Sequence, residues 1–166
     1  RTHGDRVYLD VPFEEVRMTY AETLRTAEAI GTGLLADGAR PGDRLLIMAP
    51  NCSQVILSWF GSALAGMVEV PINTAYSGSF LEHQVRTTRP RAAVVTADLA
   101  ERFLDGGEPY ESLERFYVVG AGEERDAAIA ALRKAGWEAR PWDELTTHEP
   151  GELPAVAAHE LASVFF

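Results

Sequence analysis

The sequence has 166 residues, which is enough for one ordinary domain with a substantial buried core. Hydrophobic residues make up 46% and charged residues 24%, a globular composition that argues against disorder. Fifteen basic and twenty-five acidic side chains give a net charge of -10, which disfavours nonspecific binding to nucleic acid or to anionic membranes. A nucleotide-using enzyme stays compatible with this charge, because backbone amides can hold phosphate on an acidic protein.

Cysteine content and hydropathy exclude several further classes of protein. Cys52 is the only cysteine, so an intrachain disulfide and a cysteine-built zinc site are both excluded. Its position in an apolar helical stretch indicates a small packing residue rather than a reactive thiol. No run approaches the roughly 18 apolar residues of a membrane span. The polar N-terminal stretch shows no signal peptide, so we expect a cytoplasmic protein.

The first third of the chain predicts a hairpin followed by a helix. Residues 7–11 alternate and are rich in strand formers, and residues 14–18 are the expected partner strand. Thr19 and Glu22 have the spacing of a capping box, in which each side chain satisfies a backbone amide of the helix start. The helix is expected to continue to about residue 36 and to end at Gly38.

The remaining chain alternates apolar strands with amphipathic helices. Strands with almost no polar alternation are typical of a parallel sheet covered on both faces. The sequence therefore predicts an α/β fold: a mostly parallel, doubly wound sheet with helices on both faces. Asn51 or Ser53 is expected to cap the second helix, and residues 146–159 read as a surface loop. The expected strands are 44–49, 67–70, 92–95, 116–119 and 137–141, and the expected helices are 53–65, 79–88, 99–104 and 123–135.

The last six residues, 161–166, predict another strand. An apolar strand normally runs into a further element, and chain termini are normally polar and frayed. We therefore expect that the chain stops within a larger domain; the alternative is that 161–166 is the edge strand of a finished sheet. The first interpretation also predicts that the isolated chain self-associates through this uncovered segment.

Two glycine patterns resemble dinucleotide-binding fingerprints. Gly31 and Gly33 lie within the first helix, where the mechanism would need a strand before them, so helix packing explains them better. Gly120 and Gly122 do follow a strand and open a helix. However, Glu123 and its acidic neighbour occupy the helix start where a pyrophosphate would bind, so a tight turn is the preferred interpretation.

No catalytic constellation is visible in the residues themselves. The four histidines share no short metal-ligand spacing, and neither a G-x-S-x-G elbow nor a G-x-x-x-x-G-K-[ST] phosphate loop occurs. The sequence therefore assigns no catalytic, no cofactor-binding and no metal-binding residue.

Ordered segments between residues 18 and 95 resemble the N-terminal portion of the AMP-forming acyl-CoA synthetases, members of the adenylate-forming, AMP-binding superfamily. Each piece is short, but together and in order they are specific, and a looser likeness continues to the last residue. The segments are Thr-Tyr-Ala-Glu at 19–22, Gly-Asp-Arg at 42–44, Ile-Met-Ala-Pro-Asn at 47–51, Trp-Phe-Gly at 59–61 and Ala-Gly-Met-Val-Glu-Val-Pro-Ile-Asn-Thr-Ala-Tyr at 65–76.

The resemblance implies a parent enzyme that converts a carboxylic or fatty acid and ATP into an acyl-adenylate and pyrophosphate, after which the thiol of coenzyme A displaces AMP. ATP, Mg²⁺ and coenzyme A are its implied cofactors. It also implies that residues 1–166 are an incomplete N-terminal domain ending just before the family's phosphate loop. The chain alone is then expected to bind none of the cofactors and to be inactive.

The resemblance leaves the role of three motif residues to be decided. We expect Pro71 and Asn73 to shape a strand exit and Tyr76 to pack behind it, while a direct ligand role for Asn73 or Tyr76 is the alternative. Two other classes of function are alternatives to the synthetase. One is a stand-alone α/β binding or interaction module, and the other is a small dinucleotide-dependent oxidoreductase that uses Gly120 and Gly122.

Overall fold

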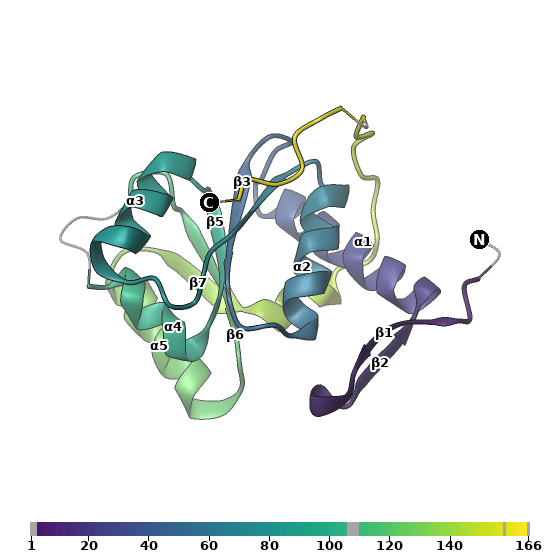
Figure 1. Ribbon diagram of the computed structural model, residues 1–166, viewed down its shortest axis with the longest axis horizontal. Helices are drawn as coiled ribbons and strands as arrows, with labels where there is room; N and C mark the ends of the chain where they lie inside the picture. The colour runs from purple at the N-terminus through teal and green to yellow at the C-terminus, as the bar shows by residue number, and fades with distance from the viewer. Residues whose placement is uncertain (1–2, 106–109, 158, 166) are drawn as a thin grey trace.

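A computed structural model describes residues 3–105, 110–157 and 159–165. Its centre is a five-stranded, entirely parallel sheet with the strand order β4-β3-β5-β6-β7 (Figure 1). The strands are near-continuous apolar runs because both faces of the sheet are covered. The predicted parallel α/β sheet is thus confirmed. Its strands are β3 (Arg44–Met48), β4 (Val68–Pro71), β5 (Ala92–Thr96), β6 (Arg115–Val119) and β7 (Glu138–Pro141).

Helices cover both faces of the sheet, as the alternating pattern predicts. In Figure 1, α1 and α2 lie to one side of the sheet, and α3, α4 and α5 lie to the other. Successive residues of a strand point to opposite faces. Val94 of β5 therefore packs in the core under α1 and α2, whereas Val95 packs in the core under α3, α4 and α5. The helices are α1 (Tyr20–Ala36), α2 (Ser53–Leu64), α3 (Gly78–Thr88), α4 (Ala97–Ala100) and α5 (Gly122–Lys134), with short 3-10 helices η2 (Glu101–Phe103) and η3 (Trp142–Thr147).

A separate antiparallel hairpin precedes α1 and extends from the body of the molecule (Figure 1). It consists of β1 (Val7–Val11) and β2 (Val16–Thr19), joined by the 3-10 turn η1 (Pro12–Glu14). The predicted partner strand 14–18 starts two residues too early, because Glu15 takes a left-handed conformation with φ of 56° to close the turn. The predicted capping box is confirmed: the Thr19 hydroxyl accepts from the Glu22 amide at 3.2 Å, and the Glu22 carboxylate accepts from the Thr19 amide at 2.8 Å.

Helices α1 and α2 pack closely because glycines face each other at their contact. A β-carbon built on Gly31 would lie 2.9 Å from the carbonyl oxygen of Gly61. One built on Gly61 would lie 2.7 Å from the β-carbon of Ile30. Neither approach leaves room for a side chain. The helix-packing interpretation of the first glycine pattern is therefore confirmed.

Three predicted elements need correction. The helix expected at 99–104 begins earlier, as α4, and ends in the 3-10 helix η2. The loop expected from residue 146 begins only after η3, whose apolar face contains the buried Trp142 and Leu145. The strand expected at 161–166 is reduced to one parallel bridge between Ser163 and Glu69 of β4; residue 166 lies outside the described residues. The pairing stays short because residues 161, 162 and 165 are exposed and make little apolar contact with β4.

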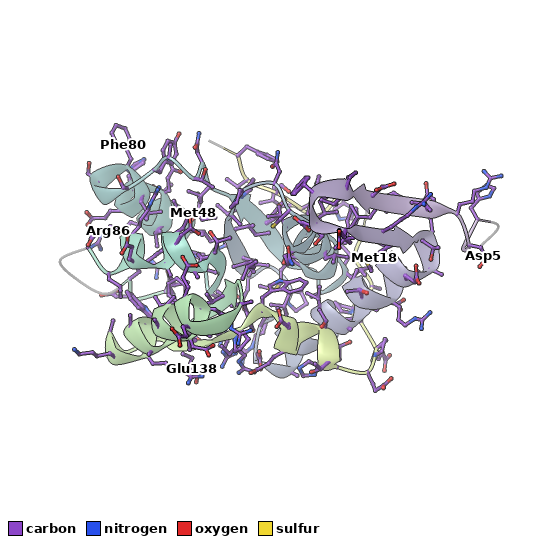
Figure 2. The ribbon with its side chains drawn as sticks, turned by 90° about the horizontal axis from the view of Figure 1, so that it is seen from below. Asp5, Met18, Met48, Phe80, Arg86 and Glu138 are labelled. Atoms are coloured by element: carbon purple, nitrogen blue, oxygen red, sulfur yellow. The ribbon has the colours of Figure 1, made fainter. Side chains whose placement is uncertain are left out.

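The amino edge of the sheet is tied to the end of α1 by charged groups. The Tyr117 hydroxyl donates to the Asp37 carboxylate at 2.6 Å, and Arg140 pairs with the same carboxylate at 3.1 Å. Arg115 donates to the Asp37 carbonyl and also pairs with Glu138, which is labelled in Figure 2. This network joins α1, β6 and β7, so these charged residues have a structural role in holding the three elements together.

Candidate functional site

The carboxyl edge of the sheet is the candidate site. β3 leads through α2 to β4 on one side, whereas β5 leads through α4 to β6 on the other. The direction in which successive strands are added across the sheet thus reverses between β3 and β5. In open α/β sheets, ligands bind outside the carboxyl ends of the strands at such a switch point. The residues that follow β3, β4, β5 and β6 are therefore the ones whose chemistry matters.

The exit from β4 is a tightly held turn. The side-chain oxygen of Asn73 accepts from the Ala75 amide at 2.9 Å. Arg102, from η2, donates one guanidinium nitrogen to the carbonyls of Thr74 and of Tyr76, the latter at 3.0 Å. Tyr76 is partly buried against the core of the α3 face. These contacts agree with a shaping role for Asn73 and Tyr76. They also engage the guanidinium group of Arg102, a residue that the sequence analysis did not single out.

The exit from β5 holds a polar group without a partner. The Thr96 hydroxyl is buried and makes no hydrogen bond within the described residues. Thr96 occupies the N-cap position of α4, yet its side chain makes no capping bond. A buried hydroxyl in this state costs free energy that a bound donor or acceptor would recover. Threonine is common at strand ends, so the sequence alone could not reveal that the Thr96 hydroxyl lacks a partner among the described residues.

The exit from β6 is acidic. Gly120 and Gly122 both have positive φ, at 138° and 64°, so these glycines form the tight turn that the sequence predicts. A surface groove of about 480 Å³ between α4 and α5 is lined by the carboxylates of Asp98, Glu101 and Glu124 together with apolar residues. Three carboxylates repel a pyrophosphate. The oxidoreductase interpretation of Gly120 and Gly122 is therefore not favoured.

The exit from β3 leads into α2, and its cap comes from a distant residue. The Glu14 carboxylate accepts from the Ser53 amide at 3.0 and 3.2 Å, so the expectation that Asn51 or Ser53 caps α2 is wrong. Cys52 lies at the N-cap position, half-buried, and not inside the helix as expected. Burial, with the nearby Glu14 charge, raises the pKa of the Cys52 thiol. The thiol therefore stays protonated, which fits a packing role.

Glu69 is a buried carboxyl group beside this edge. It lies in the middle of β4 with only 3% of its surface exposed. Burial raises the pKa of Glu69, and a hydrogen bond of 3.0 Å from the Ser163 hydroxyl partly offsets that effect. Sequence reasoning missed this residue, although a glutamate inside the apolar run 67–70 was a visible signal.

The described part of the chain contains no group of three or more His, Cys, Asp or Glu side chains that could hold a metal ion. Within the same residues, no helix is long and apolar enough to cross a membrane. The carboxyl edge thus offers shaped turns, one unpartnered hydroxyl and several carboxylates.

The fold and the sequence are those of a known enzyme family. The chain matches the AMP-binding enzyme family over residues 1–166, and it is a member of that family. The predicted resemblance is therefore confirmed.

Relatives in sequence are acyl-CoA ligases. "Acyl-CoA ligase sidI" of Aspergillus fumigatus is 34% identical over 103 residues, which are 62% of this chain and 18% of that protein. "Long-chain-fatty-acid--CoA ligase" of Bacillus subtilis is 32% identical over 89 residues, 54% of this chain and 16% of that protein. "Medium-chain acyl-CoA ligase ACSF2, mitochondrial" of Danio rerio is 37% identical over 92 residues, 55% of this chain and 15% of that protein. The matched parts thus span less than a fifth of these relatives' lengths.

Solved structures show the same fold. The anthranilate CoA ligase AuaEII in complex with anthranoyl-AMP matches 98% of this chain and 29% of its own, with a TM-score of 0.81 and 19% identity. The N-terminal domain of FACL13 from Mycobacterium tuberculosis matches 92% of this chain and 35% of its own, with a TM-score of 0.70 and 21% identity.

Proposed function

We propose that this chain is the N-terminal part of an AMP-forming acyl-CoA synthetase. In the proposed reaction a carboxylate oxygen attacks the α-phosphorus of ATP, which releases pyrophosphate and forms an acyl-adenylate. The coenzyme A thiol then displaces AMP to form the thioester. The observation that carries the proposal is the family match over residues 1–166. The order of the motif segments between residues 18 and 76 supports it, as do the names of the relatives.

The described residues do not fit ATP, Mg²⁺ or coenzyme A by themselves. Arg102 is committed to two backbone carbonyls, and the turn at Gly120 leads into a helix whose first turn carries Glu123 and Glu124. No set of carboxylates in the described ranges is grouped to hold a metal ion. We therefore propose that residues 1–166 form an incomplete AMP-binding domain, and that the groups holding ATP and Mg²⁺ belong to the rest of the parent protein.

The substrate class, partners and location follow from the same proposal. Two of the named relatives are ligases for medium-chain and long-chain acids, so we propose a carboxylic or fatty acid as the substrate. Neither nucleic acid nor membrane is proposed as a partner, given the net charge of -10. We further propose a cytoplasmic location.

Two activity measurements test the proposal. The longer protein that contains this chain should form acyl-CoA from ATP, coenzyme A and a fatty acid, with pyrophosphate release. The 166-residue chain should show neither acyl-adenylate formation nor micromolar affinity when titrated calorimetrically with MgATP. A longer protein inactive on a panel of short, medium, long and aromatic acids would contradict the synthetase. Tight MgATP binding by the chain alone would show that its site is already complete.

We also propose that the isolated chain self-associates. Leu161 is 64% exposed and Phe165 is 70% exposed on either side of the single bridge to β4. Exposed apolar residues on a weakly paired strand favour pairing with a second chain. Sedimentation over a concentration series should show association, and Leu161→Ser with Phe165→Ser should reduce it. A stable monomer at every concentration would contradict the proposal.

A further inference from the structure

Residues 162–164 are attached to the sheet through a single residue of β4. The Glu69 amide donates to the Ala162 carbonyl at 2.8 Å, and the Val164 amide donates to the Glu69 carbonyl at 2.8 Å. The Ser163 hydroxyl donates to the Glu69 carboxylate at 3.0 Å. Backbone and side chain of Glu69 therefore both hold this segment, while Val164 packs against the core.

The Glu69 carboxyl group lies among apolar residues. Leu45 is its neighbour across the pairing of β3 with β4, and Met67, just before β4, packs in the same core cluster as Leu45. This is the face under α2, a helix without any charged residue. Charged side chains on the elements that pair with β4 point elsewhere. Arg44 of β3 donates to carbonyls at the end of α3, and His159 and Glu160, which precede the segment, are exposed.

We propose that Glu69 is a positioning residue that clasps residues 162–164 to the outer edge of β4, and that the clasp loosens when Glu69 ionises. The neutral carboxyl group is the form that tolerates an apolar pocket closed by the segment. When the segment leaves, water reaches the carboxylate and the ionised form is stabilised. Docking of the segment and protonation of Glu69 therefore favour each other.

The direction of the pH dependence follows from linkage. Burial holds the pKa of Glu69 higher in the docked state than in the undocked state. The clasp is therefore fully formed below the undocked pKa, and it weakens as the pH rises through the docked pKa. Each unit of difference between the two pKa values weakens docking by about tenfold once Glu69 is ionised.

The clasp matters for the carboxyl edge, a consequence that rests on the proposed function. Because Ser163 pairs in parallel with Glu69, the segment runs in the same direction as β4 and reaches the edge where ligands of such sheets bind. In Figure 1 the yellow segment passes over α1 and α2 and ends beside the central sheet. Glu69 thus sets where residue 165 stands relative to the exits of β3 and β4.

Amide hydrogen exchange on the 166-residue chain, at a concentration where sedimentation shows a monomer, tests the clasp without any substrate. We expect the protection of the Val164 amide, corrected for its intrinsic exchange rate, to fall about tenfold or more between about pH 5 and about pH 8. Glu69→Gln keeps the shape but cannot ionise, so its protection should change less than about twofold over the same range. The Val94 amide at the sheet centre reports any global opening.

Matched variants make the result decisive. Glu160→Gln removes an exposed carboxylate just before the segment and should leave the pH dependence as in the wild type. Ser163→Ala removes the hydroxyl that stabilises the charge, so the ionised carboxylate is even less tolerated in the docked pocket. Because the docked pKa rises while the undocked pKa does not, the loss of protection should become larger and extend to higher pH. That expectation has a direct counterpart in a carbon-detected titration of Glu69, whose pKa should rise in Ser163→Ala.

Three outcomes would overturn the clasp. They are protection of Val164 that does not vary with pH in the wild type, pH dependence that persists in Glu69→Gln, and a Glu69 pKa equal to that of an exposed carboxylate. The titration needs no variant, so it decides even where Glu69→Gln fails to fold. In the longer protein, the KM for ATP should rise with pH as the clasp loosens, and Glu69→Gln should reduce that rise. A longer protein without ligase activity would refute the proposed function and leave the exchange result standing.

Discussion

Replacing Gly61 by alanine should destabilise the chain by about 2 kcal/mol. The new β-carbon would lie 2.7 Å from the β-carbon of Ile30 and 3.1 Å from the carbonyl oxygen of Ala27. Both belong to the body of α1, so the helices must separate, and overpacking of this kind costs roughly 1–3 kcal/mol. We take the upper end because a contact under 3.0 Å cannot be relieved by a rotamer change. Alanine recovers about 1 kcal/mol of helix propensity.

Urea and thermal denaturation of the chain measure this change, at a concentration where sedimentation shows one species. For a domain of this size, about 2 kcal/mol lowers Tm by roughly 4–8 °C. Gly33→Ala is the matched control, since its β-carbon would meet the movable ring of His148 at 2.8 Å. The control should stay within about 1 kcal/mol of the wild type. A Gly61→Ala chain as stable as the wild type would refute the close packing of α1 on α2.

Two further changes probe polar contacts. Ser58→Ala removes the hydroxyl that accepts from the buried Trp142 indole N–H at 2.8 Å, so it should lower the free energy of unfolding by about 1–3 kcal/mol, measured by denaturation. The control Ser62→Ala loses only a hydrogen bond within its own helix and should lower it by less. The ion pair with Arg115 lowers the pKa of Glu138, so its contribution is present above the unfolded pKa and is lost as the pH falls through the folded one. Glu138→Gln should therefore make Tm less sensitive to acid, measured by scanning calorimetry from pH ~6 to pH ~3; an unchanged slope would contradict this.

The elements that the sequence predicted well are those with a local cause. The capping box needs only Thr19 and Glu22, three residues apart, so its geometry could be predicted from spacing. The strand 92–95 was found because continuous apolar residues have few other uses in an α/β protein. The strand expected at 161–166 failed for the opposite reason. Its apolar residues satisfied the local pattern, but of the described residues 161–165 only Ser163 pairs with β4.

The contacts that sequence reasoning missed join residues far apart in the chain. Glu14 caps Ser53 across 39 positions, and Ser163 bonds to Glu69 across 94. No periodicity encodes such a pair, because each partner is an ordinary polar residue in its own segment. Of these four residues, Glu69 alone stands out in the sequence, because it is a carboxylate within the apolar strand β4.

Electrostatics indicate what this chain contributes if the proposed function holds. ATP and coenzyme A are polyanions, whereas the chain carries a net charge of -10 and places Asp98, Glu101 and Glu124 around the groove between α4 and α5. At the exit from β4, the Arg102 guanidinium group already donates to backbone carbonyls. Stabilising phosphate charge needs preorganised donors and cations, which these residues do not supply. The contribution of this chain to such a site is therefore geometric: it supplies a rigid sheet and a fixed β4 exit, and through Glu69 a clasp that sets where residues 162–164 lie.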